Sequence, residues 1–231
     1  MNIVTWNMQG ASHSTENKWN FGVMPLLRSM DPTPVVCLQE CGGVPASAVQ
    51  IDTINFLLPD GTIDTVEVYM WGGTDTRLGY FIFFHNWDTG GNRVNTAIVT
   101  DTPPENFQTS VVLLSPAGGA VWRPALGIAF GATWVFSFHA ISPGGPDGAG
   151  LLTAVAGNYA TWIVGADWNR TPDTLAIPAG SVICPPDANT FAVQNPRYKY
   201  DYCVCSGADA ITGAIVNTII VSDHYPVQFA F

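Results

Sequence analysis

The chain has 231 residues, 47% hydrophobic and 11% charged, a composition that excludes a disordered protein and fits one globular domain spanning residues 1–231. A formal net charge of −10, with only eight Lys and Arg residues, excludes a broadly basic surface, so any contact with DNA must come from a local patch. The uncharged stretch at residues 124–146 is broken by Gly, Ser, His and Pro and offers no transmembrane segment.

Short apolar runs split by Gly, Pro, Asn and Asp predict many strands and few helices. In chain order, we expect a strand at 2–7, a helix at 19–30, a strand at 35–39, a partly helical segment at 44–56, strands at 67–71, 80–85, 96–99, 125–130 and 134–139, a helix at 147–159, and strands at 162–167, 200–205 and 227–231. Because strands outnumber helices, the pattern favours stacked sheets with outer helices.

The cysteines do not identify a cellular compartment. Their odd number excludes complete internal pairing of Cys37, Cys41, Cys184, Cys203 and Cys205. We expect them to pack in the core, with a disulfide as the alternative.

Polar, reactive side chains stand repeatedly at the ends of the predicted strands. Those that follow a strand are Asn7, Glu40, His139, Asp167 and Asn169, and those that precede the last strand are Asp223 and His224. Alone, each is typical of a turn or an edge position. Their serial recurrence indicates a shared cleft, because strand ends can aim polar groups into one place.

The residue types also suit one chemistry. Glu40 and Asp223 are suitable ligands for Mg²⁺, which prefers hard oxygen atoms and keeps several waters. A carboxylate beside an imidazole fixes the tautomer and raises the pKa of the ring, which makes a proton-transfer pair. Asn and Arg side chains bind phosphate without removing a proton from it. The pattern therefore indicates metal-assisted phosphate chemistry.

At this point a family resemblance becomes visible in segments that run in order along the whole chain. The segments are Thr5-Trp6-Asn7-Met8-Gln9-Gly10 with Glu16, Lys18, Trp19 and Asn20; Gln39-Glu40; residues 91–99 and 123–128; His139-Ala140 with Gly144, Gly145 and Asp147; Asp167-Trp168-Asn169-Arg170; Asp201-Tyr202; and residues 222–227. Together they resemble the cytolethal distending toxin B subunit, within the deoxyribonuclease I-like endonuclease/exonuclease/phosphatase superfamily.

The resemblance implies an α/β (α+β) fold, a four-layer sandwich of two packed mixed β-sheets flanked by helices. It also implies a role for each site residue. Glu40 would bind the metal with Asn7 and Asp223 nearby, His139 and His224 would be the catalytic imidazoles, Asp201 would support His139, Asp167 and Asn169 would orient water and phosphate, and Arg93 and Arg123 would contact phosphates. The implied cofactor is Mg²⁺, with Mn²⁺ or Ca²⁺ as substitutes in vitro.

Some features depart from the family pattern. Ala166 replaces the usual Gly before the Asp-x-Asn motif, the stretch between Asp201 and Asp223 is short, and surface basic residues are sparse. These departures leave the catalytic set intact, but they count against toxin delivery subunits as partners and against strong DNA affinity. No signal peptide is recognisable, and we expect a secreted mature form that is delivered into host cells.

Three functions are compatible with these observations. The first is a metal-dependent hydrolase acting on phosphoester bonds, a Mg²⁺-dependent deoxyribonuclease that uses His/Asp general acid–base catalysis and binds DNA in a weak, salt-sensitive way. The second is a phosphoinositide phosphatase or another lipid phosphoesterase on the same fold. The third is a non-catalytic binding subunit, which predicts an eroded catalytic set, and no erosion is visible.

Overall fold

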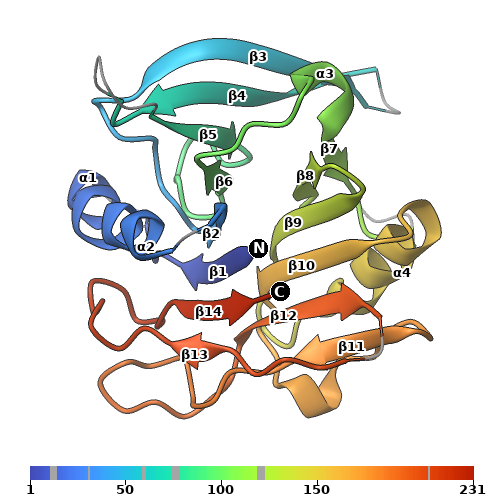
Figure 1. Cartoon of the computed structure of the whole chain (residues 1–231). Coiled ribbons are helices and arrows are strands. Elements are labelled where there is room, and N and C mark those ends of the chain that lie inside the picture. The colour runs from blue at the N-terminus through green and yellow to red at the C-terminus, as the bar shows by residue number, and fades with distance from the viewer. Residues whose placement is uncertain (11–14, 31, 59–60, 74–78, 119–122, 208) are drawn as a thin grey trace.

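A computed structural model describes residues 1–10, 15–30, 32–58, 61–73, 79–118, 123–207 and 209–231. Within these residues, the strands form an eight-stranded sheet with the order β13-β14-β1-β2-β6-β5-β4-β3 and a six-stranded sheet with the order β11-β12-β10-β9-β8-β7 (Figure 1). Both sheets are mixed, because β1 is parallel to β2 and β10 is parallel to β9 while the other pairs are antiparallel. The two mixed sheets confirm the predicted fold class.

The strands of the first sheet are β1 (Asn2–Asn7), β2 (Pro34–Gln39), β3 (Val49–Leu57), β4 (Ile63–Trp71), β5 (Tyr80–His85), β6 (Thr96–Thr100), β13 (Ala214–Ile215) and β14 (Val227–Ala230). Those of the second sheet are β7 (Val111–Leu114), β8 (Ala125–Phe130), β9 (Thr133–His139), β10 (Trp162–Asp167), β11 (Ser181–Cys184) and β12 (Asp201–Ser206). The two chain ends meet at Met1 and Phe231, whose backbones are hydrogen bonded.

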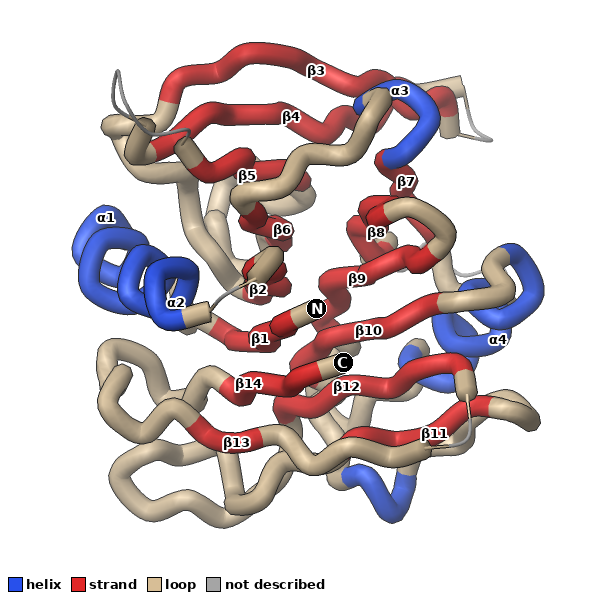
Figure 2. Tube along the Cα trace, in the orientation of Figure 1, coloured by secondary structure: helices blue, strands red, loops and turns tan. Residues whose placement is uncertain are grey.

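Helices lie outside the two sheets (Figure 2). They are α1 (Thr15–Lys18), the π-helical turn η1 (Trp19–Val23), α2 (Met24–Ser29), α3 (Phe107–Ser110), α4 (Gly148–Asn158) and the short η2 (Pro172–Thr174). The segment α1-η1-α2 lies beside the first sheet and α4 beside the second, which gives the four layers (Figure 1). None of the helices in the described part of the chain is long and apolar enough to cross a membrane.

Successive side chains of the central strands point to opposite faces of the sheet, so the buried residues form two separate clusters. On β1, Ile3 faces the core between the sheets, whereas Val4 and Trp6 pack under the α1-η1-α2 segment. This is the period of two that strand geometry imposes. The sheets approach closely at Gly165, where an added Cβ would lie 3.3 Å from Thr5. The central strand β1 is therefore packed on both of its faces.

A buried pair of hydrogen bonds joins the two sheets between β2 and β9. The buried side chain of Gln39 donates from Nε2 to the hydroxyl of Ser137 over 3.1 Å, and that hydroxyl donates to the carbonyl of Leu38 over 2.9 Å. A buried amide needs such partners, because an unpaired polar group in the core is costly. The contact fixes the end of β2 against β9.

The prediction for residues 44–56 was wrong. The segment contains no helix, and from Val49 it pairs with β4 as an edge strand. Several of its apolar side chains, including those of Val49, Ile51 and Leu57, are exposed. The sequence also gave no sign of α3, β7, β11 or β13, which are only two to four residues long. In elements this short, tertiary pairing decides the conformation.

The cysteines lie in the described part of the chain, and each is free and buried, as the core-packing interpretation predicted. Cys184 and Cys205 come closest, with their sulfur atoms 3.7 Å apart.

Candidate active site

Polar side chains from both sheets meet at one edge of the sandwich. The carboxyl ends of β1, β2, β9 and β10 place Asn7, Glu40, His139 and Asp167 there. The amide of Asn7 donates to Oδ2 of Asp167 over 2.8 Å and so connects the two sheets. Because β12 is antiparallel to β10, its first residue, Asp201, lies directly opposite Asp167.

The turns that follow three of these strands have an unusual backbone. The backbone φ angles of Gln9, Glu40 and Asn169 are 50°, 46° and 49°. These values lie in the left-handed region, which residues other than glycine rarely adopt. Gly10 packs so tightly against the turn after β2 that an added Cβ would collide with the carbonyl oxygen of Glu40. Such strain persists where the surrounding structure enforces it, commonly at functional sites.

A cleft of about 540 Å³ opens over these strand ends. Every residue predicted for the site lines it, except Asp201. The lining residues from the prediction are Asn7, Glu40, Arg93, Arg123, His139, Asp167, Asn169, Asp223 and His224. The structure therefore brings nine of the ten predicted site residues together at one cleft.

His224 forms a buried ion pair behind the cleft. Its Nδ1 lies 2.7 Å from Oδ2 of Asp201, and its Nε2 lies 3.9 Å from both Asp167 and Asp223. Burial disfavours the charged ring, but the carboxylates of Asp201 and Asp167 outweigh burial and raise the pKa of His224 to about 10. At neutral pH this ring is an imidazolium that can donate from Nε2 into the cleft.

His139 has the opposite character. Burial lowers its pKa to about 4, and the nearby charge of Arg123 contributes in the same direction. Arginine has no acceptor, so Nη1 of Arg123 donates to Nδ1 of His139 over 3.0 Å. The ring is therefore neutral, and its single proton sits on Nε2, which lies 3.5 Å from Glu40 and 3.7 Å from Asp167.

Asp167 stands between the two imidazoles. Its carboxylate accepts from the amide of Asn7 and from the backbone N–H of Asn169, the latter over 2.9 Å. Burial, more than any other influence, raises the pKa of Asp167, which makes it a stronger base than an exposed aspartate. The side chain of Asn169 donates to the carbonyl of Ala140 and is thereby held at the cleft wall.

The opposite side of the cleft is open enough for a hydrated cation. The side chains of Glu40 and Asp223 are 21% and 39% exposed. Burial raises the pKa of Glu40, and repulsion from Asp167 and Asp223 adds to this effect. A cluster of partly exposed carboxylates that repel one another fits a hard divalent cation that retains water, because the cation relieves the repulsion.

Asn7 lies beside this cluster but presents its nitrogen to it. Its amide oxygen accepts from the backbone N–H of Gln9 over 2.8 Å, while Nδ2 donates to Glu40 and Asp167. An amide nitrogen does not coordinate Mg²⁺. In this structure the Asn7 amide therefore orients the two carboxylates, and its role as a metal ligand stays a prediction.

A second group of potential ligands is less suitable for a metal. Among the described residues, Asp167, Asp201 and His224 have ligand atoms within 4.8 Å of one another. All three are buried, and the hydrogen bond to Asp201 occupies Nδ1 of His224. The three residues therefore form an ion pair between the imidazolium of His224 and the carboxylates of Asp201 and Asp167.

The structure corrects one predicted pairing. Asp201 supports His224 and does not support His139. The strand order β12-β10-β9 explains the difference, because β10 with Asp167 separates Asp201 from His139. Asp223, although adjacent to His224 in sequence, is 3.9 Å from its Nε2 and forms no hydrogen bond at that distance.

Several residues that position the site were not predicted. The indole of Trp6 donates to the carbonyl of His224 over 3.0 Å, and the hydroxyl of Ser222 donates to the carbonyl of Asn7 over 2.7 Å. Both residues lie within the segments that carried the family resemblance, so a signal was present. Asp88, which organises the loop before Arg93, had no comparable signal.

Comparison with known proteins agrees with this geometry. No protein-family model matches the chain. The chain is 32% identical to the cytolethal distending toxin B subunit homolog of Salmonella typhi, over 98% of this chain and 88% of that protein. The crystal structure of cytolethal distending toxin from Actinobacillus actinomycetemcomitans superimposes with a TM-score of 0.81 and 27% identity, over 99% of this chain and 97% of that chain.

A more distant structure shares the fold alone. Truncated TDP2 from Caenorhabditis elegans matches with a TM-score of 0.56 and 12% identity, over 98% of this chain and 95% of that chain. The fold and the site thus define an α/β sandwich with a His–carboxylate cleft at its strand ends. At 32% identity over nearly its whole length, the chain belongs to the family of cytolethal distending toxin B subunits.

Proposed function

We propose that this protein is a metal-dependent phosphodiesterase whose substrate is DNA. The observation that carries the proposal is the convergence of an imidazolium, His224, and a buried carboxylate, Asp167, whose facing atoms are 3.9 Å apart in one cleft. Hydrolysis of a phosphodiester by water needs a base for the proton of the attacking water and a positive group for the phosphate charge, and Asp167 and His224 can supply them. Membership in a family of toxin subunits supports the same conclusion.

Each residue then has a role. Asp167, whose pKa is raised by burial, takes a proton from the attacking water. His224, which is charged at neutral pH, donates from Nε2 to a phosphate oxygen. His139 donates from Nε2 without carrying charge, since Arg123 holds its other nitrogen. Asn169 donates one hydrogen of its amide nitrogen to the carbonyl of Ala140 and would donate the second to the phosphate. These donors stabilise the negative charge that develops in the transition state.

Glu40 and Asp223 would hold the metal, which we propose to be Mg²⁺, with Mn²⁺ or Ca²⁺ as substitutes in vitro. When bound, the ion supplies positive charge beside the non-bridging phosphate oxygens. Asn7 keeps the carboxylate of Glu40 in place through its 3.3 Å hydrogen bond. Arg93 lines the same cleft from an exposed loop and can neutralise a second phosphate.

A phosphoinositide phosphatase is the second candidate. The observation in its favour is that Arg93 and Arg123 line one compact cleft, as a headgroup with clustered phosphates requires. A duplex instead needs contacts spread along a groove. A non-catalytic binding role is disfavoured, because the set of candidate catalytic side chains is complete.

One experiment separates these functions. The purified protein is incubated with supercoiled plasmid and, in parallel, with phosphoinositide vesicles, each with Mg²⁺ and with EDTA. We expect nicking of the plasmid in Mg²⁺ and none in EDTA. Phosphate release from vesicles without nicking would select the lipid substrate, and no turnover of either would select the non-catalytic role.

The family also supports a proposal about where the protein acts. Its relatives are named as subunits of a toxin. We therefore propose a secreted protein that is delivered into host cells. The sparse basic surface and the shortened segment between Asp201 and Asp223 count against the same delivery subunits as partners.

A further inference from the structure

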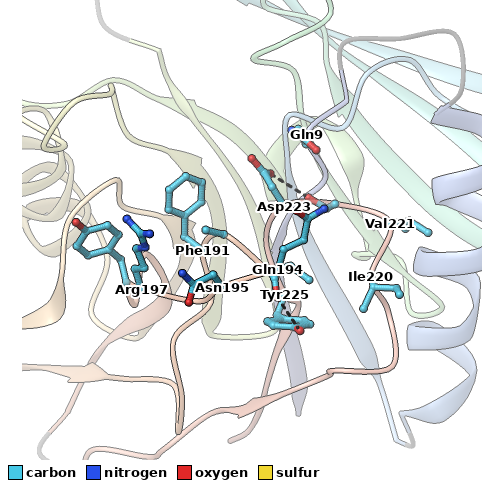
Figure 3. A pocket seen from close by; sticks show the side chains of 13 residues that line it. Gln9, Phe191, Gln194, Asn195, Arg197, Ile220, Val221, Asp223 and Tyr225 are labelled. Carbon is cyan, nitrogen blue, oxygen red and sulfur yellow. Dashed lines mark hydrogen bonds between the residues drawn. The ribbon is translucent and has the colours of Figure 1, made fainter.

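A second, larger cavity adjoins the catalytic cleft. Its volume is about 950 Å³, and it shares Gln9, Phe191 and Asp223 with the cleft as a common wall. Figure 3 shows Phe191 and Arg197 on one side of this cavity and Ile220 and Val221 on the other, with Asp223 between them. A polymer bound across the cleft would continue into this space.

A row of adjoining aromatic rings leads from His224 to the second cavity. The ring of Phe191 lies 4.8 Å from that of His224 and 5.4 Å from that of Tyr200, centroid to centroid. Tyr200 in turn stacks on Tyr198 at 5.1 Å with an angle of only 4° between the ring planes. The last ring, Tyr198, is 44% exposed and lines the cavity.

The row is held rigidly relative to the site. The hairpin that carries it is fixed where Val193 N–H donates to the carbonyl of Asp223 over 3.1 Å and Tyr225 N–H donates to that of Thr190 over 2.9 Å. The hydroxyl of Tyr225 adds a bond to the carbonyl of Val193. The hairpin is therefore bonded to the residues on either side of His224, so the distance from ring to imidazole is set by the fold.

We propose that this cavity is a stacking subsite for an unpaired nucleobase next to the scissile phosphate, with Tyr198 as the platform and Arg197 as the contact to the adjoining phosphate. The proposal rests on the proposed phosphodiesterase function and specifies its substrate as single-stranded or locally opened DNA. In an intact duplex both faces of each base are covered by neighbouring bases, so only an unstacked base can lie on Tyr198.

The charge of the molecule favours this substrate over a closed duplex. A net charge of −10 repels a polyanion, and the described basic side chains in the two cavities are Arg93, Arg123 and Arg197. Stacking on an aromatic ring provides affinity that does not depend on charge and does not depend on base sequence. An acidic nuclease can therefore hold a strand through its bases where it lacks a basic groove.

The test compares Tyr198→Ala with the wild type and with Tyr198→Phe, which keeps the ring. The substrates are a single-stranded oligonucleotide, the same sequence as a duplex, and a single strand that is abasic beside one defined phosphodiester. We expect the wild type to prefer the single strand and Tyr198→Ala to lower kcat/KM on it about tenfold or more, mainly through KM. Tyr198→Phe should retain wild-type values.

The abasic strand makes the result specific. Wild type and Tyr198→Ala should cleave its abasic position equally slowly, since neither protein can form the stack there. Equal kcat/KM for Tyr198→Ala and wild type on the normal strand would overturn the subsite while leaving phosphodiesterase activity established. Absence of cleavage by the wild type on every substrate would instead overturn the proposed function.

A lipid chain is the competing occupant of the cavity, because Ile220 and Val221 are exposed on its other side. Ile220→Ser and Val221→Ser remove apolar side chains that an acyl chain would contact, and each should lower cleavage of the single strand less than Tyr198→Ala does. If these variants instead abolish hydrolysis of phosphoinositide in vesicles while Tyr198→Ala has no effect on the oligonucleotide, the cavity binds acyl chains and the nucleobase proposal is wrong.

Discussion

At the scale of single residues, the two histidines of the cleft differ in charge because their partners differ. His224 faces Asp201 and Asp167, whereas His139 accepts from Arg123. The sequence placed both imidazoles at strand ends but could not assign these partners, since Asp201 and Arg123 belong to segments whose neighbours only the sheet order defines. Because of this difference in charge, His224 can act as a proton donor, whereas His139 is a neutral group that orients the substrate.

The first prediction concerns Glu40. Glu40→Gln removes a charge and nearly preserves shape, so the variant should require a much higher Mg²⁺ concentration for half-maximal nicking while its melting temperature changes little. Glu105→Gln, in an exposed loop away from the cleft, is the matched control and should follow the wild-type curve. A wild-type Mg²⁺ dependence in Glu40→Gln would remove Glu40 from the metal site.

The second prediction concerns pH and stability. The pKa of His224 is about 10 in the folded protein and about 6.5 when the ring is free. A raised pKa means that the ion pair stabilises the fold fully below pH 6.5 and that this contribution is lost as the pH rises from 6.5 to 10. Asp201→Asn removes the hydrogen-bonded carboxylate and should flatten this loss.

Urea unfolding of both proteins at several pH values between 6 and 10 provides the measurement. The wild type should lose more stability across this window than Asp201→Asn does. Parallel stability curves for the two proteins would show that Asp201 does not hold His224 in its charged form.

At the scale of elements, the sequence predicted the central strands and failed at the edges. Strands β1, β2, β9 and β10 are apolar runs followed by polar residues, so both the strands and the polar residues at their ends were visible in the sequence. Residues 44–56 were misassigned because Ile54 is the only buried residue of the edge strand β3, so its apolar residues gave no clear period of burial. The pairing of Asp201 with His224 depends on sheet order, which no local pattern records.

The third prediction tests the turn after β2. An added Cβ at Gly10 would collide with the carbonyl of Glu40, whereas at Gly43 it would meet nothing within 4 Å. Gly10→Ala should therefore displace Glu40 and raise the Mg²⁺ concentration needed for activity, and Gly43→Ala should not. Mg²⁺ titration of plasmid nicking by the two variants is the measurement, and equal titrations would contradict the proposed coupling between this turn and the metal.

At the scale of the whole molecule, charge limits how DNA can be bound. With eight basic residues against eighteen acidic ones, few contacts to phosphate are possible, and in the described part of the chain Arg93, Arg123 and Arg197 line the two cavities. This charge balance is read from composition without any structure, and the prediction of one domain for residues 1–231 rests on composition and length in the same way. The two adjoining cavities and their aromatic wall could not be predicted from composition. Tyr198, Tyr200 and His224 are brought together only by the attachment of the hairpin to the sandwich.

The fourth prediction follows from this charge balance. Each phosphate contact contributes about −0.9 to the slope of log affinity against log salt concentration for duplex DNA and about −0.7 for a single strand. With about two to four such contacts, the slope should lie between roughly −1 and −4. Binding of a labelled oligonucleotide in EDTA over a range of NaCl concentrations gives the slope, and a value near −10 would show that a much larger basic surface takes part.

The central claim is that one cleft hydrolyses phosphodiesters with Asp167 as its base, and the nicking rate of Asp167→Asn tests this most directly. Asparagine is nearly the same size as aspartate, but its amide cannot accept the proton of the attacking water. At saturating Mg²⁺, and with a circular dichroism spectrum like that of the wild type, the variant should nick supercoiled plasmid about 10²–10⁴-fold more slowly. A folded Asp167→Asn that nicks at the wild-type rate would contradict the account.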